Sequence, residues 1–166
     1  MRLAPVSAWS LRALVVGIVL TLSACNATLA PGYDPELVSD LNAANEQALI
    51  LFSEVSQGAS TARYAALAPT YDALIGKFDA LRLRAAAREV PDLGREIGAR
   101  LCSDDDDPSG CVNASPGSLE AIVENFQKMK QNNQKNGLTP LEVKGLKNAY
   151  ETSIEQVLLV ETSLKS

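Results

Sequence analysis

Residues 64–85, YAALAPTYDALIGKFDALRLRA, carry the clearest folding signal of this 166-residue chain. Their apolar side chains recur in alternating steps of three and four residues, at Tyr64, Leu67, Tyr71, Leu74, Phe78, Leu81 and Ala85. This spacing places one continuous apolar stripe on one face of an α-helix, so the segment predicts a helix that packs along its whole length against a partner helix. Ser60 is expected to be its N-cap, and Pro69 is expected to kink the helix or delay its start.

Three further segments share this pattern. The first begins at the N-cap Asp34 and ends before Gly58, the next ends before Gly137, and the last begins at the capping box of Thr139 and Glu142. Four long amphipathic helices with short joins predict an all-α fold, an antiparallel helical bundle. An elongated helical hairpin and a coiled coil that needs a partner chain are the alternatives. The apolar positions of the three segments are Leu37, Leu41, Ala44, Ala48, Leu51 and Val55; Leu119, Ile122, Val123, Phe126 and Met129; and Val143, Leu146, Tyr150, Ile154, Val157, Val160 and Leu164.

Charge supports the pairing of the first two helices, because the first carries mostly acidic side chains and the second mostly basic ones. Each exposed pair contributes little by itself. Arg88 falls on the apolar stripe of the second helix and is the one charged residue out of pattern. We expect it either at the end of the bundle or against a buried carboxylate. The other acidic residues are expected on outward, solvated positions.

A proline-containing break follows the second helix, after which Leu93, Ile97 and Leu101 predict a short helical piece. Gly94 and Gly98 lie within this piece, four residues apart. In membranes such small residues let helices dimerise, but in a segment this short and polar we expect them to mark close packing.

A loop is expected from 103 to 116, with a run of four aspartates at 104–107. Cys102 and Cys111 are an even pair that we predict to form a disulfide closing this loop. The alternative of a redox or metal-binding pair lacks the C-x-x-C spacing. The aspartates lack the D-x-D-x-D-G spacing of a calcium loop, so we predict a solvated loop and no metal site.

The N-terminal segment has the layout of an export signal. Basic residues Arg2 and Arg12 precede an apolar run from Ala13 to Leu22, which is too short for a membrane-spanning helix. The motif Leu22-Ser23-Ala24-Cys25 then resembles the lipobox of bacterial lipoproteins. An ordinary signal peptide, with the cysteine near the cleavage site by chance, is the alternative.

The resemblance implies that residues 1–24 are cleaved and that Cys25 carries the acyl chains that anchor the protein stably in a membrane. It also implies the outer membrane facing the periplasm, because Asn26 replaces the aspartate that retains such proteins at the inner membrane. Residues 25–33 would then be a lipidated tether, and 34–166 a single helical domain.

Composition excludes several functions. The chain has no histidine, which removes the usual general base and metal ligand, and the motifs of haem, di-iron and serine-triad sites are absent. The net charge of −5 argues against nucleic acid as a partner. We therefore expect no catalytic residues and no cofactor. We predict an envelope protein that scaffolds or binds another envelope protein. The alternative is a binder of a small apolar or lipid ligand between the helices, and a carboxylate-based hydrolase is a weaker third reading.

Overall fold

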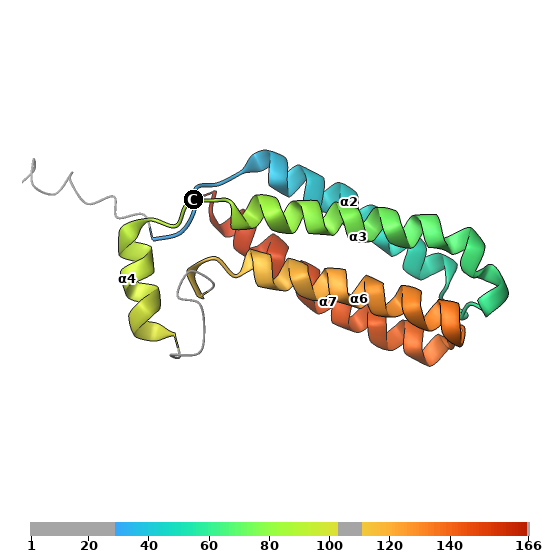
Figure 1. The fold of residues 1–166 in the computed structure, drawn as a ribbon. Coiled ribbons are helices and arrows are strands. Elements are labelled where there is room, and N and C mark those ends of the chain that lie inside the picture. Colours follow the sequence, from blue (N-terminus) through green and yellow to red (C-terminus); the bar gives the residue numbers. More distant parts are fainter. Residues whose placement is uncertain (1–28, 103–110, 166) are drawn as a thin grey trace, which may run out of the picture.

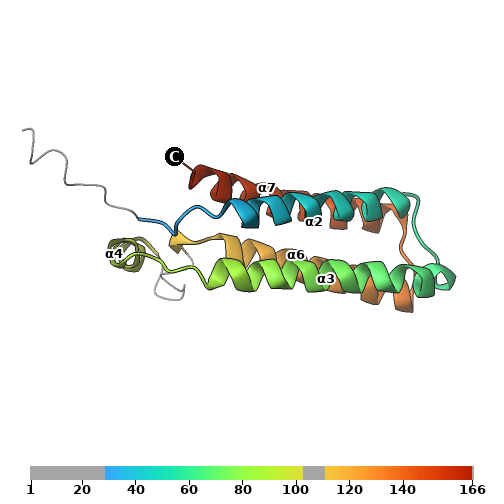
Figure 2. The ribbon, with the colours of Figure 1, turned by 90° about the horizontal axis from the view of Figure 1, so that it is seen from above.

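Four amphipathic helices pack along their apolar stripes and form an antiparallel bundle (Figures 1 and 2). The structure, a computed structural model, describes residues 29–102 and 111–165. Each bundle helix packs against two neighbours, in the order α2, α3, α6 and α7 around the bundle. The predicted all-α bundle is therefore confirmed. Its helices are α2 (Pro35–Glu54), α3 (Tyr64–Ala86), α6 (Ser115–Lys135) and α7 (Pro140–Ser163).

A fifth helix, α4 (Asp92–Leu101), lies beyond one end of the bundle (Figure 1). At that end α2 and α6 begin and α3 and α7 finish, and the described chain starts there at Leu29. We call it the tether end. Within residues 29–102 and 111–165, no helix is both long enough and apolar enough to cross a membrane.

An aromatic cluster fills the middle of the bundle. It joins all three phenylalanines of the chain, Phe52, Phe78 and Phe126, to Tyr150, with ring centroids 5.3 to 6.0 Å apart. Such contacts between buried rings add to the gain from burying their apolar area. Phe78, Phe126 and Tyr150 belong to the predicted apolar stripes of α3, α6 and α7. Phe52 of α2 was not among the predicted stripe residues.

Two tyrosines of the predicted apolar stripes are core residues whose hydroxyls make hydrogen bonds. Tyr150 is fully buried and its hydroxyl donates to Oδ1 of Asn45 at 2.8 Å, while buried Tyr71 donates to Oδ1 of Asn133 at 3.3 Å. Burial raises the pKa of Tyr71 to about 12 and raises the pKa of Tyr150 further. Tyr64, the third tyrosine of the predicted stripes, is only half-buried.

The predicted helix ends are largely confirmed. Oδ1 of Asp34 accepts the amide of Leu37 at 3.0 Å, and Thr139 and Glu142 form the reciprocal capping box. Gly58 and Gly137 adopt φ angles of 88° and 78° in the turns at the far end of the bundle, a left-handed conformation that favours glycine.

Two helix starts differ from the sequence expectation. Ser60 does not cap α3: it precedes a 3₁₀ turn, η1 (Thr61–Arg63), and its side chain makes no capping hydrogen bond. Since α3 begins directly after this turn, Pro69 lies inside the helix. The predicted loop is also too long at its end, since α6 already begins at Ser115.

Ion pairs join α2 to α3, as the opposite charges predicted. The guanidinium of Arg84 contacts the carboxylates of Asp34 at 2.9 Å, Glu36 at 2.7 Å and Asp40 at 3.3 Å. Burial by itself would raise the pKa of Asp34. The hydrogen bonds from the Leu37 amide and from Arg84 outweigh this effect and hold the pKa below its usual value.

Candidate functional site

A buried polar cluster lies at the tether end, where α3, α6 and α7 meet. Arg88, just after α3, makes a two-pronged ion pair with Glu161 of α7, at 2.7 Å from Nη1 to Oε2 and 2.5 Å from Nη2 to Oε1. The carboxyl-bearing side chain of Glu161 is 0% exposed and that of Arg88 is 12% exposed. Both expectations for Arg88 are confirmed: it lies at the end of the bundle, and its partner is a buried carboxylate.

Glu161 is the residue that sequence reasoning missed. The expectation that acidic side chains all point outward is wrong for it, and the expected stripe residues Val160 and Leu164 are only half-buried. The signal was present, since Glu161 follows the buried Val157 by four residues and so continues the stripe of α7. Two charges of opposite sign, each at the last position of a stripe, predict a buried pair.

Residues at the start of α6 complete the cluster. The hydroxyl of Ser115 donates to Oε1 of Glu161 at 2.5 Å, and the amide of Asn113 donates to the carbonyl of Ala85 at 3.0 Å. Nη1 and Nη2 of Arg88 both donate hydrogen bonds, whereas its buried Nε has no hydrogen-bond partner among the described residues. The cluster thus fixes three helix ends to one another by charge-assisted hydrogen bonds.

The tether contacts the protein at this same end. Arg88 donates to the carbonyl of Gly32 at 3.4 Å, and Pro31 is buried. Farther toward the N-terminus, the backbone of Leu29 lies against Gly94 of α4 so closely that a Cβ atom at position 94 would overlap the Leu29 carbonyl. From residue 29 onward, the predicted tether therefore contacts the protein at several points. The prediction that Gly94 marks close packing is confirmed.

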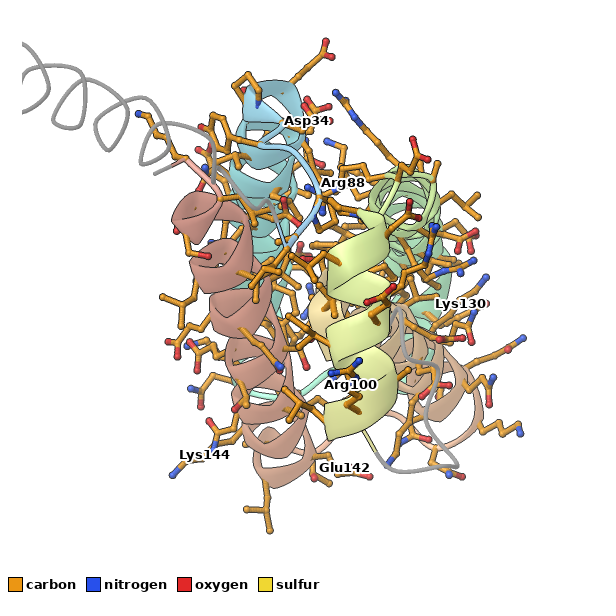
Figure 3. The ribbon with its side chains drawn as sticks, turned by 90° about the vertical axis from the view of Figure 1, so that its left-hand side faces the viewer. Asp34, Arg88, Arg100, Lys130, Glu142 and Lys144 are labelled. Carbon is orange, nitrogen blue, oxygen red and sulfur yellow. A yellow bond between two sulfur atoms is a disulfide. The ribbon has the colours of Figure 1, made fainter. Side chains whose placement is uncertain are left out.

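Helix α4 presents Leu93 and Leu101 to solvent. Figure 3 views the molecule from this end, with α4 in front of the bundle. Leu93 is 42% exposed and Leu101 is 81% exposed, whereas Gly94 and Gly98 are the buried positions. No other described helix packs against α4.

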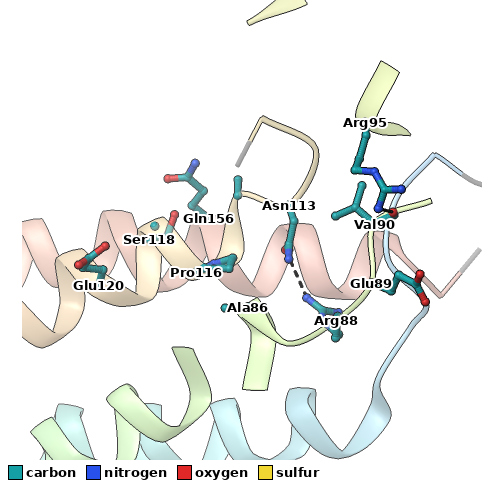
Figure 4. A pocket seen from close by; sticks show the side chains of 12 residues that line it. Ala86, Arg88, Glu89, Val90, Arg95, Asn113, Pro116, Ser118, Glu120 and Gln156 are labelled. Carbon is teal, nitrogen blue, oxygen red and sulfur yellow. Dashed lines mark hydrogen bonds between the residues drawn. The ribbon is translucent and has the colours of Figure 1, made fainter. Parts of the chain in front are cut away.

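An open cavity of about 750 Å³ lies between α4 and the bundle end (Figure 4). Arg88 and Arg95 line it together with Glu89 and Glu120, so charges of both signs face it. Arg95 is itself engaged, since it donates to the carbonyl of Val90 at 3.2 Å and pairs with Asp92. The described residues contain no group of three or more His, Cys, Asp or Glu side chains that could hold a metal ion.

The predicted site residues have different outcomes. Cys102 and Cys111 lie at disulfide distance, with Cα atoms 6.3 Å apart, within the usual range, which supports the predicted pairing. The residues between these two cysteines, 103–110, lie outside the described residues, and so does Cys25.

A second surface feature is a groove of about 460 Å³ between α6 and α7. Ala121, Gly145 and Ala149 give it a floor of small side chains, and Glu124 and Lys128 stand at its edge. Asn125 lies beneath it, 9% exposed, with its Nδ2 donating to the carbonyl of Leu146 at 2.9 Å. Its Oδ1 is buried and has no partner among the described residues. The groove therefore offers close approach to the backbone of α7.

Comparisons with known proteins add no relative: no protein-family model, no curated protein and no solved structure matches the chain.

Proposed function

We propose that this chain is a bacterial envelope lipoprotein, anchored by acyl chains on Cys25, whose helical bundle binds another envelope protein and performs no chemistry itself. The lipobox motif supports the anchor. The structure supports a binding role, because the bundle places its polar and charged side chains on accessible long faces and fills its interior. The proposed location is the outer membrane, with the domain in the periplasm.

One observation carries the interaction role, the groove between α6 and α7. Its floor of small residues gives room for a helix or an extended segment to approach closely. A bound partner would also reach the neighbourhood of Asn125, whose buried Oδ1 finds no hydrogen-bond partner in the described part of the chain. Because an unsatisfied buried acceptor costs free energy, a partner that brings a donor would recover it. The charges of Glu124 and Lys128 at the edge would orient that partner.

The packing of the core favours this role over a ligand held between the helices. The four rings of the aromatic cluster occupy the middle of the bundle in mutual contact. The two cavities described above open at the surface, and none of the four rings lines either of them.

The anchor is tested by Cys25→Ser, with membrane fractionation of cells and mass spectrometry of the purified protein. We expect the wild-type N-terminal cysteine to carry acyl chains. We expect the variant to leave the membrane fraction or to keep its leader. A variant that is processed and remains in the membrane like the wild type would refute lipidation at this cysteine.

The partner is tested by lysine crosslinking in cells, followed by pull-down and mass spectrometry of wild type, Gly145→Gln and Gly76→Gln. Both glycines are helical and exposed, and a Cβ atom at either meets no heavy atom within 4 Å, so neither change disturbs the bundle. Only position 145 lies in the groove. We expect one dominant envelope protein with wild type and Gly76→Gln, and its loss with Gly145→Gln. Equal capture by both variants, or no specific capture at all, would refute the proposal that the partner binds in the groove.

A further inference from the structure

We propose that α4 lies in the membrane surface and inserts Leu93, Ile97 and Leu101 between the lipid headgroups, so that the protein has a second membrane contact besides its acyl chains. This inference rests on the proposed anchor at Cys25. The apolar side chains of α4 would contact the same bilayer that holds the acyl chains. The experiment below distinguishes a failure of the α4 contact from a failure of the anchor at Cys25.

The three side chains form one apolar stripe, in which Leu93 and Leu101 are exposed and Ile97 between them is half-buried. They are spaced by four residues, which places them within about 80° of one another at 100° per residue of α-helix. Leu101 is 81% exposed and Leu93 is 42% exposed. Because α4 packs against no other described helix, no conformational change of the bundle is needed to present this stripe.

The position of the tether brings this stripe to the bilayer. Leu29 packs directly on Gly94 of α4, and only four peptide units separate Leu29 from Cys25. Four residues span at most about 14 Å when fully extended. A lipidated Cys25 sits at the interface between headgroups and acyl chains, so α4 must lie within this distance of the membrane surface. An amphipathic helix binds there with its apolar face about 5–10 Å deep.

One charge of α4 suits the same surface. On a helical wheel, Arg100 lies next to Leu93 at one border of the apolar face. The other charged side chains of α4, Asp92, Arg95 and Glu96, lie farther from this face. Arg100 can reach phosphate groups from the border while the other charges stay in water. The apolar face is therefore free to enter the headgroup region of a membrane.

The experiment uses a tryptophan reporter in the lipidated full-length product. The only tryptophan of the chain is Trp9, in the leader, so the processed protein has none. Leu101→Trp places one on α4. Leu141→Trp is the matched control, since Leu141 is 79% exposed and lies at the start of α7, at the far end of the bundle. Each protein is reconstituted in phosphatidylethanolamine vesicles with a minor phosphatidylglycerol fraction, with and without a dibrominated phosphatidylcholine that quenches tryptophan on contact. Mass spectrometry of the same samples reports acylation.

We expect the emission of Leu101→Trp to shift to shorter wavelength. We expect its quenching to exceed that of Leu141→Trp by roughly twofold or more, because only the former would lie at the depth of the bromines. Adding Ile97→Asp to Leu101→Trp should reduce the quenching to the level of the control while the far-UV circular dichroism stays helical. An acylated protein in which both reporters are quenched equally would overturn the inference and leave the anchor standing. A protein without acyl chains at Cys25 would overturn both.

Discussion

Glu161→Gln removes the negative charge of the buried ion pair at the tether end while keeping the size of the side chain. Glu161 is fully buried, and both of its oxygens accept from Arg88, one of them also from Ser115. The variant therefore leaves the guanidinium of Arg88, which is 12% exposed, without its counter-ion. An uncompensated charge is costly in a site with this little access to water.

Removing one partner of a buried ion pair costs about 3–5 kcal/mol, and glutamine can still accept one hydrogen bond, so we expect a loss of about 3 kcal/mol. For a domain of this size that loss lowers Tm by roughly 10 °C. Arg88→Met should cost a similar amount. The double variant removes both charges and should be more stable than the sum of the single losses predicts, by about 2 kcal/mol.

Urea unfolding followed by circular dichroism at 222 nm measures these differences on the domain from residue 29 onward, with m unchanged between variants. Glu151→Gln is the matched control, because Glu151 lies on the same helix in an exposed pair with Lys147 at 2.8 Å. Its loss should stay below about 1 kcal/mol. Similar losses for Glu161→Gln and Glu151→Gln, or exact additivity in the double variant, would refute the conclusion that the cluster is a coupled, buried pair.

Three further outcomes follow from the structure. Replacing Cys102 and Cys111 by serine should lower the free energy of unfolding by about 2–3 kcal/mol, the chain-entropy value for a loop this short, and free thiols in the oxidised wild type would contradict the pairing. The folded-state pKa of Asp34 is lowered, so its contribution to stability is full above its ordinary value of 3.8 and is lost as the pH falls through the lower folded value. Urea titrations from pH 6 to pH 2 should show this loss and show it reduced in Asp34→Asn. Gly94→Val should release the tether from α4 and speed hydrogen exchange of 29–33, whereas Gly76→Ala, at an open helical position, should leave that exchange unchanged and stabilise the protein by roughly 0.5–1 kcal/mol.

Much of the bundle could be predicted from the sequence because its signals are local. The alternation of three and four residues along 64–85 specifies which face of a helix is apolar whatever packs against it. The caps at Asp34 and Thr139 depend on residues two or three positions away, and the stops at Gly58 and Gly137 on one backbone angle each. These features determined the helix number, most helix ends and the core.

The candidate sites depended on tertiary structure. Glu161 and Arg88 are 73 residues apart, and only the packing of the bundle, in which α3 and α7 run in the same direction and finish at the same end, brings them together. In α4, the same kind of apolar spacing that marks a core stripe elsewhere faces solvent, because the tether occupies the glycine face and no bundle helix reaches the leucines. Which faces are apolar can be derived from the residue order, since helical periodicity is a local property. Which of those faces are buried, and which charges meet, depends on the folded chain, because burial requires another part of the chain to pack opposite.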